Sequence, residues 1–324
     1  MVGMVRVHKY GGPEVLTYED VPLPPPGPGE VQIRHTAIGL NFVETYFRSG
    51  LYKSAVLPFV PGNEGAGVVT AVGEHVNDFH AGDRVAYATY IGSYSEARNI
   101  PASGLVHLPA AIDDRTAAAM MLKGMTVQYL VRRTFEVKPG DTVLIQAAAG
   151  GIGLILSQWC HALGAKVIGT VGSKQKAELA YSHGCDEVIL YRTEDFVQRV
   201  KEITGGKGCD VVYDGVGQDT YPASLDCLKP RGLWVSFGNA SGAIKDFNLL
   251  LLSQKGSLYA TRPTLNTHIS TREDLLATAN DLFEVVLKGT VKIPIHQTYA
   301  LKDVQKAHRD LENRVTTGAS LLLP

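Results

Sequence analysis

The sequence predicts an α/β protein with two domains: a doubly wound parallel-sheet domain and a smaller, β-rich, barrel-like domain. Three observations predict this. The chain has 324 residues, 45% of them hydrophobic, which suffices for two cores because a domain usually takes roughly 100–200 residues. Its first third consists of short apolar stretches between turns, and its middle alternates strands with helices.

Residues 1–120 are predicted to be mainly β. Apolar stretches such as Val31–Arg34 and Gly67–Val72 lie between turn clusters, a pattern typical of a compact β-domain. Five prolines between Pro22 and Pro28 favour an extended surface connector, because proline suits neither a helix interior nor a central strand. Gly82–Ala86 is predicted to be a turn that enters a strand.

Six strands alternate with helices in the middle of the chain, where helical periodicity begins near Ala117. The predicted strands are 142–146, 166–170, 187–190, 210–213, 233–237 and 258–260, and the helices between them include 153–163, 175–183 and 196–204. Strand–helix–strand order demands right-handed crossovers and a parallel sheet. Six strands is the number found in a complete doubly wound dinucleotide-binding domain.

The C-terminal segment is predicted to return to the first domain. It carries a helix at 274–288, a short strand near 297–299, a helix at 302–313 and a closing strand at 320–323. The predicted domains are therefore residues 1–122 together with 272–324, and residues 123–271.

Charge and cysteine content exclude several classes of protein. Lys and Arg total 31 against 32 Asp and Glu, so nucleic acid is not the expected partner, because such proteins usually carry a basic excess. The four cysteines are dispersed without a C-x-x-C pair, which argues against a disulfide framework or a zinc knuckle. No apolar run approaches the ~18 residues of a membrane span, and no apolar leader opens the chain. We expect a cytoplasmic protein.

The strongest local signal is the segment from Asp141 to Gly153, where a buried strand enters a turn of small residues that opens a helix. Gly150 would let the backbone approach a pyrophosphate, and Gly153 would let the helix pack tightly on the sheet. The helix N-terminus would present free N–H groups to the anion. Ala148 occupies the first glycine position of the G-x-G-x-x-G pattern. The context of strand, helix and sheet predicts dinucleotide binding.

The end of the second strand distinguishes NADPH from NADH. An NAD site usually has an Asp or Glu there, about 20 residues beyond the glycine-rich turn, to hold the ribose 2′-OH. Residues 170–176 contain no carboxylate and instead provide the Ser173 hydroxyl, Lys174 and Lys176. Two lysines at a helix start are also common as solvated side chains. The missing acid and the added cations together favour a 2′-phosphate and hence NADPH.

A run in the first domain, Val60–Val69 followed by Ala71–Gly73 and Ala81–Val85, resembles the signature of medium-chain dehydrogenase/reductases. Zinc-dependent members of that superfamily have a histidine, a zinc ligand, where this chain has Asn63. The upstream cysteine ligand and the four-cysteine structural loop are missing too. A zinc site needs at least three Cys, His or carboxylate ligands, so no metal site is predicted.

The resemblance extends over nearly the whole chain and narrows to zinc-free, zeta-crystallin-like quinone oxidoreductases. The motifs that carry it are Tyr10–Leu16, Gly39–Phe42, Tyr46–Tyr52, Leu122–Thr126, Ala147–Gly153, Tyr213–Gly217, Ser236–Asn239 and Thr261–Pro263. It implies a GroES-like catalytic domain, a Rossmann domain, NADPH as cofactor and reduction of quinones without zinc in the cleft between the domains.

The resemblance also implies roles for particular residues. Asn41, Tyr46 and Tyr52 would line the nicotinamide and quinone site, in a segment whose Gly39 and Gly50 permit tight turns. Cofactor contacts would come from Asn41, Thr126, Gly150, Gly151, Ile152, Gly153, Gly172, Ser173, Lys176, Tyr191, Val216, Phe237, Asn239, Arg262 and Arg314. Alternatively, the tyrosines are core aromatics and Arg314 is a cation at a helix end. No acid/base pair is evident, and His8, His35 and His80 are expected at the surface or as caps.

The sequence is also compatible with two other functions, and it predicts a homodimer. An enzyme of the same fold could reduce activated C=C bonds, as in 2-alkenals or enoyl thioesters. A binding protein, structural or RNA-binding like some zeta-crystallin relatives, fits less well because basic segments with interleaved aromatics are missing. The strand at Ser257–Thr261 is predicted at a sheet edge, which must be covered. Pairing with a twofold mate, aided by Leu249–Leu252, would make a homodimer.

Overall fold

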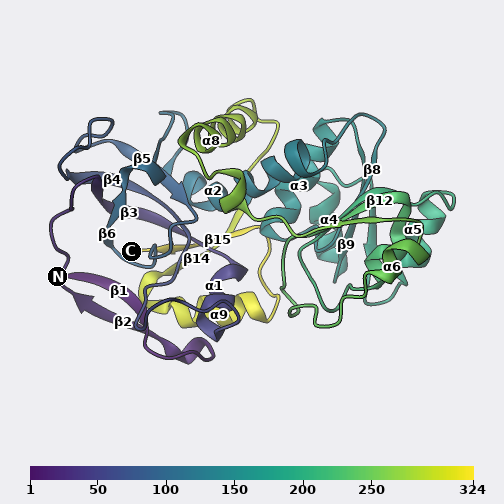
Figure 1. Ribbon diagram of the computed structural model, residues 1–324, viewed down its shortest axis with the longest axis horizontal. Helices are drawn as coiled ribbons and strands as arrows, with labels where there is room; N and C mark the ends of the chain where they lie inside the picture. Colours follow the sequence, from purple (N-terminus) through teal and green to yellow (C-terminus); the bar gives the residue numbers. More distant parts are fainter. The chain divides into compact units, whose positions relative to one another are not determined.

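The computed structural model describes every residue from Met1 to Pro324 and contains two compact units (Figure 1). Unit 1 comprises Met1–Met125, Ile269–Leu287 and Ile293–Pro324, and unit 2 comprises Thr126–His268 and Lys288–Lys292. None of the helices is long and apolar enough to cross a membrane.

Unit 2 is built on a six-stranded sheet. Its strands are β8 (Thr142–Ile145), β9 (Lys166–Val171), β10 (Glu187–Leu190), β11 (Cys209–Asp214), β12 (Leu228–Ser236) and β13 (Tyr259–Thr261). They are all parallel and lie in the order β10-β9-β8-β11-β12-β13. This confirms the predicted doubly wound sheet. The strand bounds agree with the prediction within two residues, except that β12 begins five residues early.

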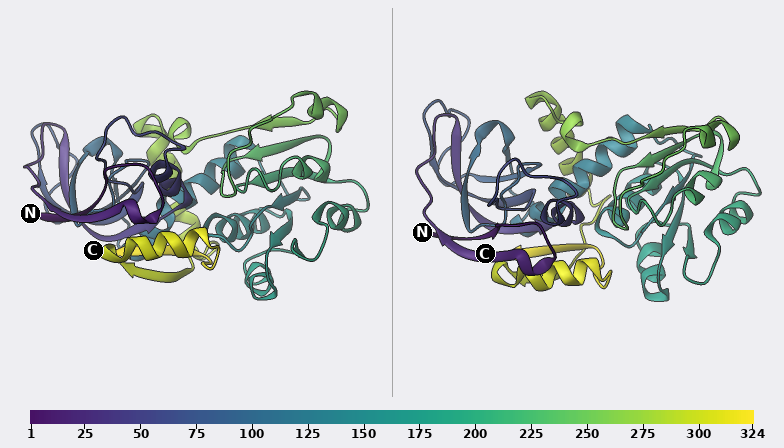
Figure 2. Two further views of the ribbon diagram at one scale, coloured as in Figure 1. Left: turned by 90° about the horizontal axis from the view of Figure 1, so that it is seen from below. Right: turned by 60° about the horizontal axis from the view of Figure 1, so that its bottom comes forward.

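Helices cover both faces of this sheet (Figure 2). The chain steps outward from β8 through α3 (Gly151–Ala162) and α4 (Lys174–Tyr181), and it crosses back through α5 (Phe196–Ile203). The turn η4 (Ala223–Cys227) and α6 (Leu250–Gln254) follow on the face that α5 covers. Right-handed crossovers place α3 and α4 on the opposite face. The apolar side chains of α5, η4 and the strands form one core, which includes Leu144, Ile168, Val200, Leu225 and Val212.

Unit 1 contains a bent, mostly antiparallel sheet. The strands β3 (Glu30–Leu40), β4 (Glu64–Val72), β5 (Arg84–Ala88), β7 (Val106–His107), β14 (Ile295–Ala300) and β15 (Ala319–Leu323) lie in the order β14-β15-β3-β4-β5-β7, and β6 (Ala97–Pro101) also pairs with β3. Irregularities in β3 at Gln32/Ile33 and at His35/Ala37 bend the strand, so it pairs with three neighbours. As predicted, the C-terminal strands complete this sheet.

A hairpin and several helices close unit 1. The hairpin consists of β1 (Val2–Val7) and β2 (Leu16–Val21), and α9 (Val304–Glu312) lies beside it in both views of Figure 2. The other helices of this part are α1 (Phe42–Ser49) and α8 (Arg272–Leu287), while α2 (Asp114–Tyr129) continues into unit 2. In unit 2, α2 is followed by a short π-helical turn at Leu130–Thr134. Unit 2 also contains the short helix α7 (Leu265–His268).

The expectation that His35 lies at the surface was wrong. Its side chain is buried, with 3% exposure, because its position in β3 faces the core. Nδ1 lies 2.7 Å from Ser95 O and must donate to it, because a carbonyl oxygen can only accept. In the neutral ring the other nitrogen carries no proton, so Nε2 accepts from the Tyr87 hydroxyl at 2.7 Å. Burial lowers the pKa of His35 to about 3, which makes it a neutral structural residue.

Candidate active site

The glycine-rich turn connects β8 to α3 and leaves the start of this helix without a side-chain cap. The first intrahelical bond runs from Leu154 N to Gly150 O at 3.0 Å, so the N–H groups of Gly151, Ile152 and Gly153 have no acceptor within the helix. Aligned N–H groups at a helix N-terminus attract an anion. A Cβ built on Gly150 would come near only Ala147 O, at 3.3 Å, so this position is open to a ligand.

Two residues of β9, Thr170 and Gly169, explain why alanines are accommodated at positions 147 and 148 of this turn. Ala147 adopts a left-handed backbone with φ of 58°, and it is held there because its N–H donates to Thr170 Oγ1 at 3.2 Å. Ala148 is fully buried and faces Gly169 of β9, where an added Cβ would lie 2.7 Å from the Ala148 methyl group. The alanine in the first glycine position is therefore tolerated because a glycine stands opposite it.

The ends of β9 and β10 bring together the residues predicted for the 2′-phosphate. Gly172 follows β9, and a Cβ there would lie 2.8 Å from the Tyr191 hydroxyl and 3.4 Å from Arg192 Nε. Ser173 is the N-cap of α4, and its hydroxyl accepts from Lys176 N at 3.3 Å. Sequence reasoning did not single out Arg192. The signal was present, because Arg192 directly follows Tyr191 and is a cation just beyond the end of a parallel strand.

The loops after β11, β12 and β13 lie at the same carboxyl ends of the sheet as the ends of β9 and β10. Phe237 follows β12, and its ring lies 3.0 Å from a Cβ built on Gly215. The two loops are joined by Ser241 N to Val216 O at 2.8 Å and by Ala240 N to Gly215 O at 3.2 Å, and Asn239 Cα would lie 3.3 Å from a Cβ built on Gly217. Arg262, directly after β13, donates to Ser236 O at 2.7 Å. Val216, Phe237, Asn239 and Arg262 are thus brought together.

A buried hydrogen-bond chain holds these strand ends in place. Thr170 donates to Gln146 Oε1 at 2.6 Å, Gln146 donates to Ser224 Oγ at 3.1 Å, and Ser224 donates to Asp214 Oδ2 at 2.9 Å. The backbone N–H groups of residues 216 and 217 also donate to the Asp214 carboxylate. The chain links β8, β9 and β11 around the point where the strand order reverses, which is where open α/β sheets bind ligands.

The three residues predicted for the substrate all lie in unit 1, and two of them, Tyr46 and Tyr52, contact each other. Asn41 is the N-cap of α1, and Tyr46 lies within this helix. Tyr52 N donates to Tyr46 O at 3.0 Å, and the two rings form an edge-to-face pair with centroids 5.3 Å apart. The expected tight turn at Gly39 was wrong, because Gly39 belongs to β3. Gly50, with φ of 82°, ends α1 in the left-handed conformation.

A cluster of buried polar side chains surrounds Asn41, and sequence reasoning missed it. Asn41 Nδ2 donates to Glu64 Oε1 at 2.9 Å, and Lys123 Nζ donates to the same oxygen at 2.6 Å. Glu44 accepts from Asn41 N at 2.6 Å and from Asn63 Nδ2 at 3.0 Å. Burial raises the pKa of Glu44 to about 7, and the neighbouring Glu64 adds to this while Asn63 and Lys123 oppose it.

The last two predicted contacts lie elsewhere. Thr126 is buried on α2, three residues beyond Lys123. Arg314 follows α9 with φ of 59°. The end of this helix is tied to α1, because Arg48 forms a paired hydrogen bond with Glu312 at 2.6 and 3.1 Å and also donates to His308 Nδ1 at 3.0 Å. Arg314 therefore belongs to the same unit as Asn41 and the two tyrosines.

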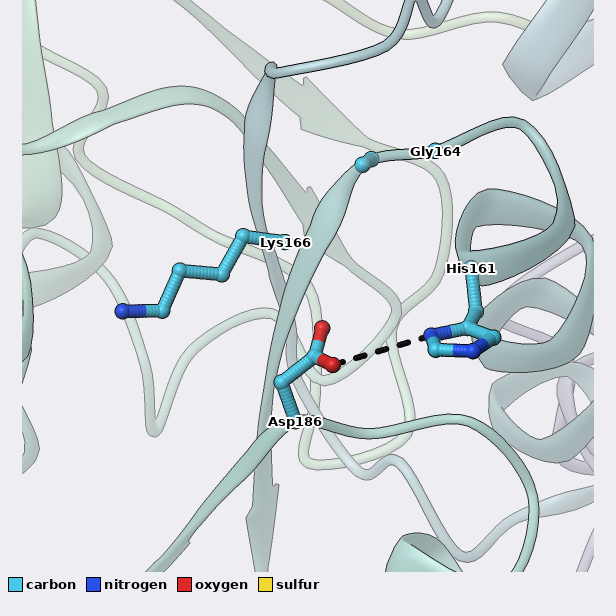
Figure 3. A pocket seen from close by; sticks show the side chains of 5 residues that line it. His161, Gly164, Lys166 and Asp186 are labelled. Carbon is cyan, nitrogen blue, oxygen red and sulfur yellow. Dashed lines mark ion pairs between the residues drawn. The ribbon is translucent and has the colours of Figure 1, made fainter.

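Neither a metal centre nor the shallow surface pocket of unit 2 is part of this site. No group of three or more His, Cys, Asp or Glu side chains is arranged to hold a metal ion. A shallow pocket of about 400 Å³ lies on unit 2 at the start of β9 and just before β10, with the His161–Asp186 ion pair at 3.6 Å on its wall (Figure 3). This is the amino end of the strands, whereas the glycine-rich turn lies at their carboxyl end.

The fold and the glycine-rich strand–helix junction define a dehydrogenase or reductase of the medium-chain type. Family models agree: residues 27–110 match the alcohol dehydrogenase GroES-like domain and residues 151–280 match the zinc-binding dehydrogenase family. Within that superfamily, the chain belongs to the zinc-free quinone oxidoreductases.

Three relatives show how far the similarity extends. A quinone oxidoreductase of Pseudomonas aeruginosa is 54% identical over the full length of both chains. A crystal structure of Escherichia coli quinone oxidoreductase complexed with NADPH superposes with a TM-score of 0.98 at 53% identity, covering 99% of this chain and 100% of that one. A 2-haloacrylate reductase of a Burkholderia species is 45% identical over 100% of this chain and 99% of its own length.

Proposed function

We propose that the protein is an NADPH-dependent quinone reductase. The observation that carries this proposal is the set of residues at the carboxyl ends of the six strands, together with full-length identity above 50% to quinone oxidoreductases. When bound, the reduced nicotinamide supplies the hydride or electrons, and the protein supplies position and electrostatics. Quinones need little activation, so side chains that orient the two ligands suffice.

The cofactor site favours NADPH. The uncapped start of α3 and the open space at Gly150 fit a pyrophosphate. Beside Gly172, where an NAD site usually has an acid, the chain instead brings Tyr191 and Arg192 and carries Lys176 four residues further along. Two cations suit a 2′-phosphate, because guanidinium and ammonium groups make short charge-assisted hydrogen bonds to phosphate oxygens. The relatives solved with NADPH support the same assignment.

The substrate would meet Asn41, Tyr46 and Tyr52. A quinone offers a flat apolar ring and two carbonyl acceptors, while tyrosine offers a ring face and an O–H donor. Tyr52→Phe is expected to keep the fold and the NADPH affinity and to lower kcat/KM for quinone about two- to tenfold, as loss of one neutral hydrogen bond would. An unchanged kcat/KM in folded Tyr52→Phe and in folded Asn41→Ala would remove both residues from the site.

A second candidate is reduction of activated C=C bonds. The Burkholderia relative, 45% identical along the whole chain, favours it, since that protein is a 2-haloacrylate reductase. The two functions share the hydride donor and differ in the acceptor. Parallel assays with 1,4-benzoquinone and 2-chloroacrylate separate them, because the quinone proposal requires the higher kcat/KM with benzoquinone.

We also propose that two copies pair through β13. This strand is at the sheet edge and Tyr259 on it is 61% exposed, while Leu249 and Leu250 nearby in the chain are 71% and 58% exposed. An uncovered edge offers unpaired N–H and C=O groups to another strand. A twofold pairing would extend the sheet across the dimer and would cover the two leucines.

A further inference from the structure

The motif Leu122–Thr126 contains a buried lysine to which the proposed reaction gives no role. Lys123 is only 5% exposed, and its ammonium lies 2.6 Å from Oε1 of Glu64, which is fully buried. Burying either charge alone would be strongly unfavourable, so the two charges depend on each other. The pair joins α2 to the first residue of β4, two segments that are 59 residues apart in the sequence.

The Glu64 carboxylate also determines how Asn41 is oriented. Its Oε1 accepts from both Lys123 Nζ and Asn41 Nδ2, and its Oε2 accepts from Leu122 N at 2.7 Å. An ionised carboxylate only accepts, so the nitrogen of the Asn41 amide must face it. Gly39 makes room for this carboxylate, because a Cβ there would lie 2.2 Å from Glu64 Oε1.

We propose that Lys123 is a positioning residue for Asn41: its ammonium holds the Glu64 carboxylate in place through Oε1, and the same oxygen accepts from Asn41 Nδ2 and so fixes the orientation of the Asn41 amide. Without the ammonium, the buried carboxylate of Glu64 would lose its counter-charge and would move from this position. The Asn41 amide would then lose the acceptor that holds its nitrogen, and the amide would be able to turn over. The inference rests on the proposed function, because it takes Asn41 as a residue that contacts the nicotinamide and the substrate.

A double-mutant cycle tests this directly. The wild type, Lys123→Met, Asn41→Ala and the double variant are compared in kcat/KM for 1,4-benzoquinone at saturating NADPH. Lys123→Met is expected to lower kcat/KM about tenfold in the Asn41 background and to add less than about twofold in the Asn41→Ala background. Lys123→Arg, which keeps the charge, should recover most of the loss. A wild-type rate in Lys123→Met, or an equal loss in both backgrounds, would overturn the proposal.

A second readout needs no acceptor. In a fluorescence titration with NADPH, Lys123→Met should raise the dissociation constant when Asn41 is present and leave it unchanged when Asn41 is alanine. If Lys123→Met does not fold, Lys123→Met/Glu64→Gln replaces it, because this pair removes both charges and keeps the shape. The same pattern is expected from that pair, and equal effects in both backgrounds would contradict it.

Asp114→Asn is the matched control. Asp114 begins α2, pairs with Arg84 at 2.5 Å and does not contact Asn41, so its variant changes an ion pair on the same helix. Its kcat/KM should stay within about twofold of the wild type; a tenfold loss would mean that both variants only displace α2, which would overturn the proposal. If the wild type reduces 2-chloroacrylate but no quinone, the proposed function fails, and the cycle is decided with that acceptor instead.

Discussion

Alanine in place of Gly150 should separate cofactor binding from folding. Gly150 has the extended backbone of a helix N-cap, with φ of −78° and ψ of 173°, which any residue adopts. Its Cβ would meet only Ala147 O, at 3.3 Å, so the fold needs to adjust by a few tenths of an ångström. The methyl group would point into the space where the pyrophosphate is proposed to lie.

The expected loss follows from the contacts that would be displaced. A hydrogen bond from a backbone N–H to an ionised group is worth about 1.5–3 kcal/mol, which corresponds to an increase of about 10- to 150-fold in the dissociation constant for NADPH. Fluorescence titration measures this, and thermal unfolding of the same sample should give a Tm within about 2 °C of the wild type.

Gly153→Ala provides the contrast. Its Cβ would lie 2.5 Å from Ala147 O and 2.6 Å from the carbonyl carbon of Ala148. These are backbone atoms, so α3 must move away from β8, at a cost of about 1–3 kcal/mol in folding stability. If Gly150→Ala binds NADPH as tightly as the wild type, the pyrophosphate does not lie at this helix. Wild-type stability of Gly153→Ala would refute the packing argument.

Three further predictions concern stability, specificity and assembly. Burial of His308, next to Arg48, lowers its pKa from 6.5 to about 3. The neutral ring therefore contributes fully to stability above pH 6.5, and this contribution is lost as the pH falls from 6.5 toward 3. At pH 5 the loss is about 2 kcal/mol, and His308→Gln should lose correspondingly less stability than the wild type between pH 7 and pH 5 in thermal unfolding. Lys176→Ala should weaken NADPH binding about 10- to 150-fold and NADH binding much less; equal affinity of the wild type for both cofactors would contradict the 2′-phosphate assignment. Leu249→Asp should shift the protein from dimer to monomer in light scattering, and a wild type that is already monomeric at micromolar concentration would refute pairing through β13.

Local patterns predicted most of unit 2. Its strands are continuous apolar runs and its helices begin at recognisable positions, so each element was evident from a short window. Helix α1 was missed although its signals were present. Asn41 followed three residues later by Glu44 is typical of a helix start, and Gly50 is typical of a helix end. Interpreting the two glycines as turns hid this pattern.

Contacts between residues far apart in the chain could not be predicted from the sequence. Glu64 and Lys123 meet only because β4 and α2 are brought together by the fold, and no spacing rule predicts a pair of this kind. Arg48 and His308 are separated by 260 residues. The burial of His35 depends on which face of a bent strand packs inward, and irregularities in β3 change that face along its length.

The function proposed for this protein is the reduction of quinones with NADPH as the preferred donor. Steady-state oxidation of NADPH and of NADH, each measured with 1,4-benzoquinone and with 2-chloroacrylate, tests it most directly. We expect the highest kcat/KM for the pair of NADPH and benzoquinone. Turnover of 2-chloroacrylate without turnover of benzoquinone, or equal use of NADH, would contradict this function.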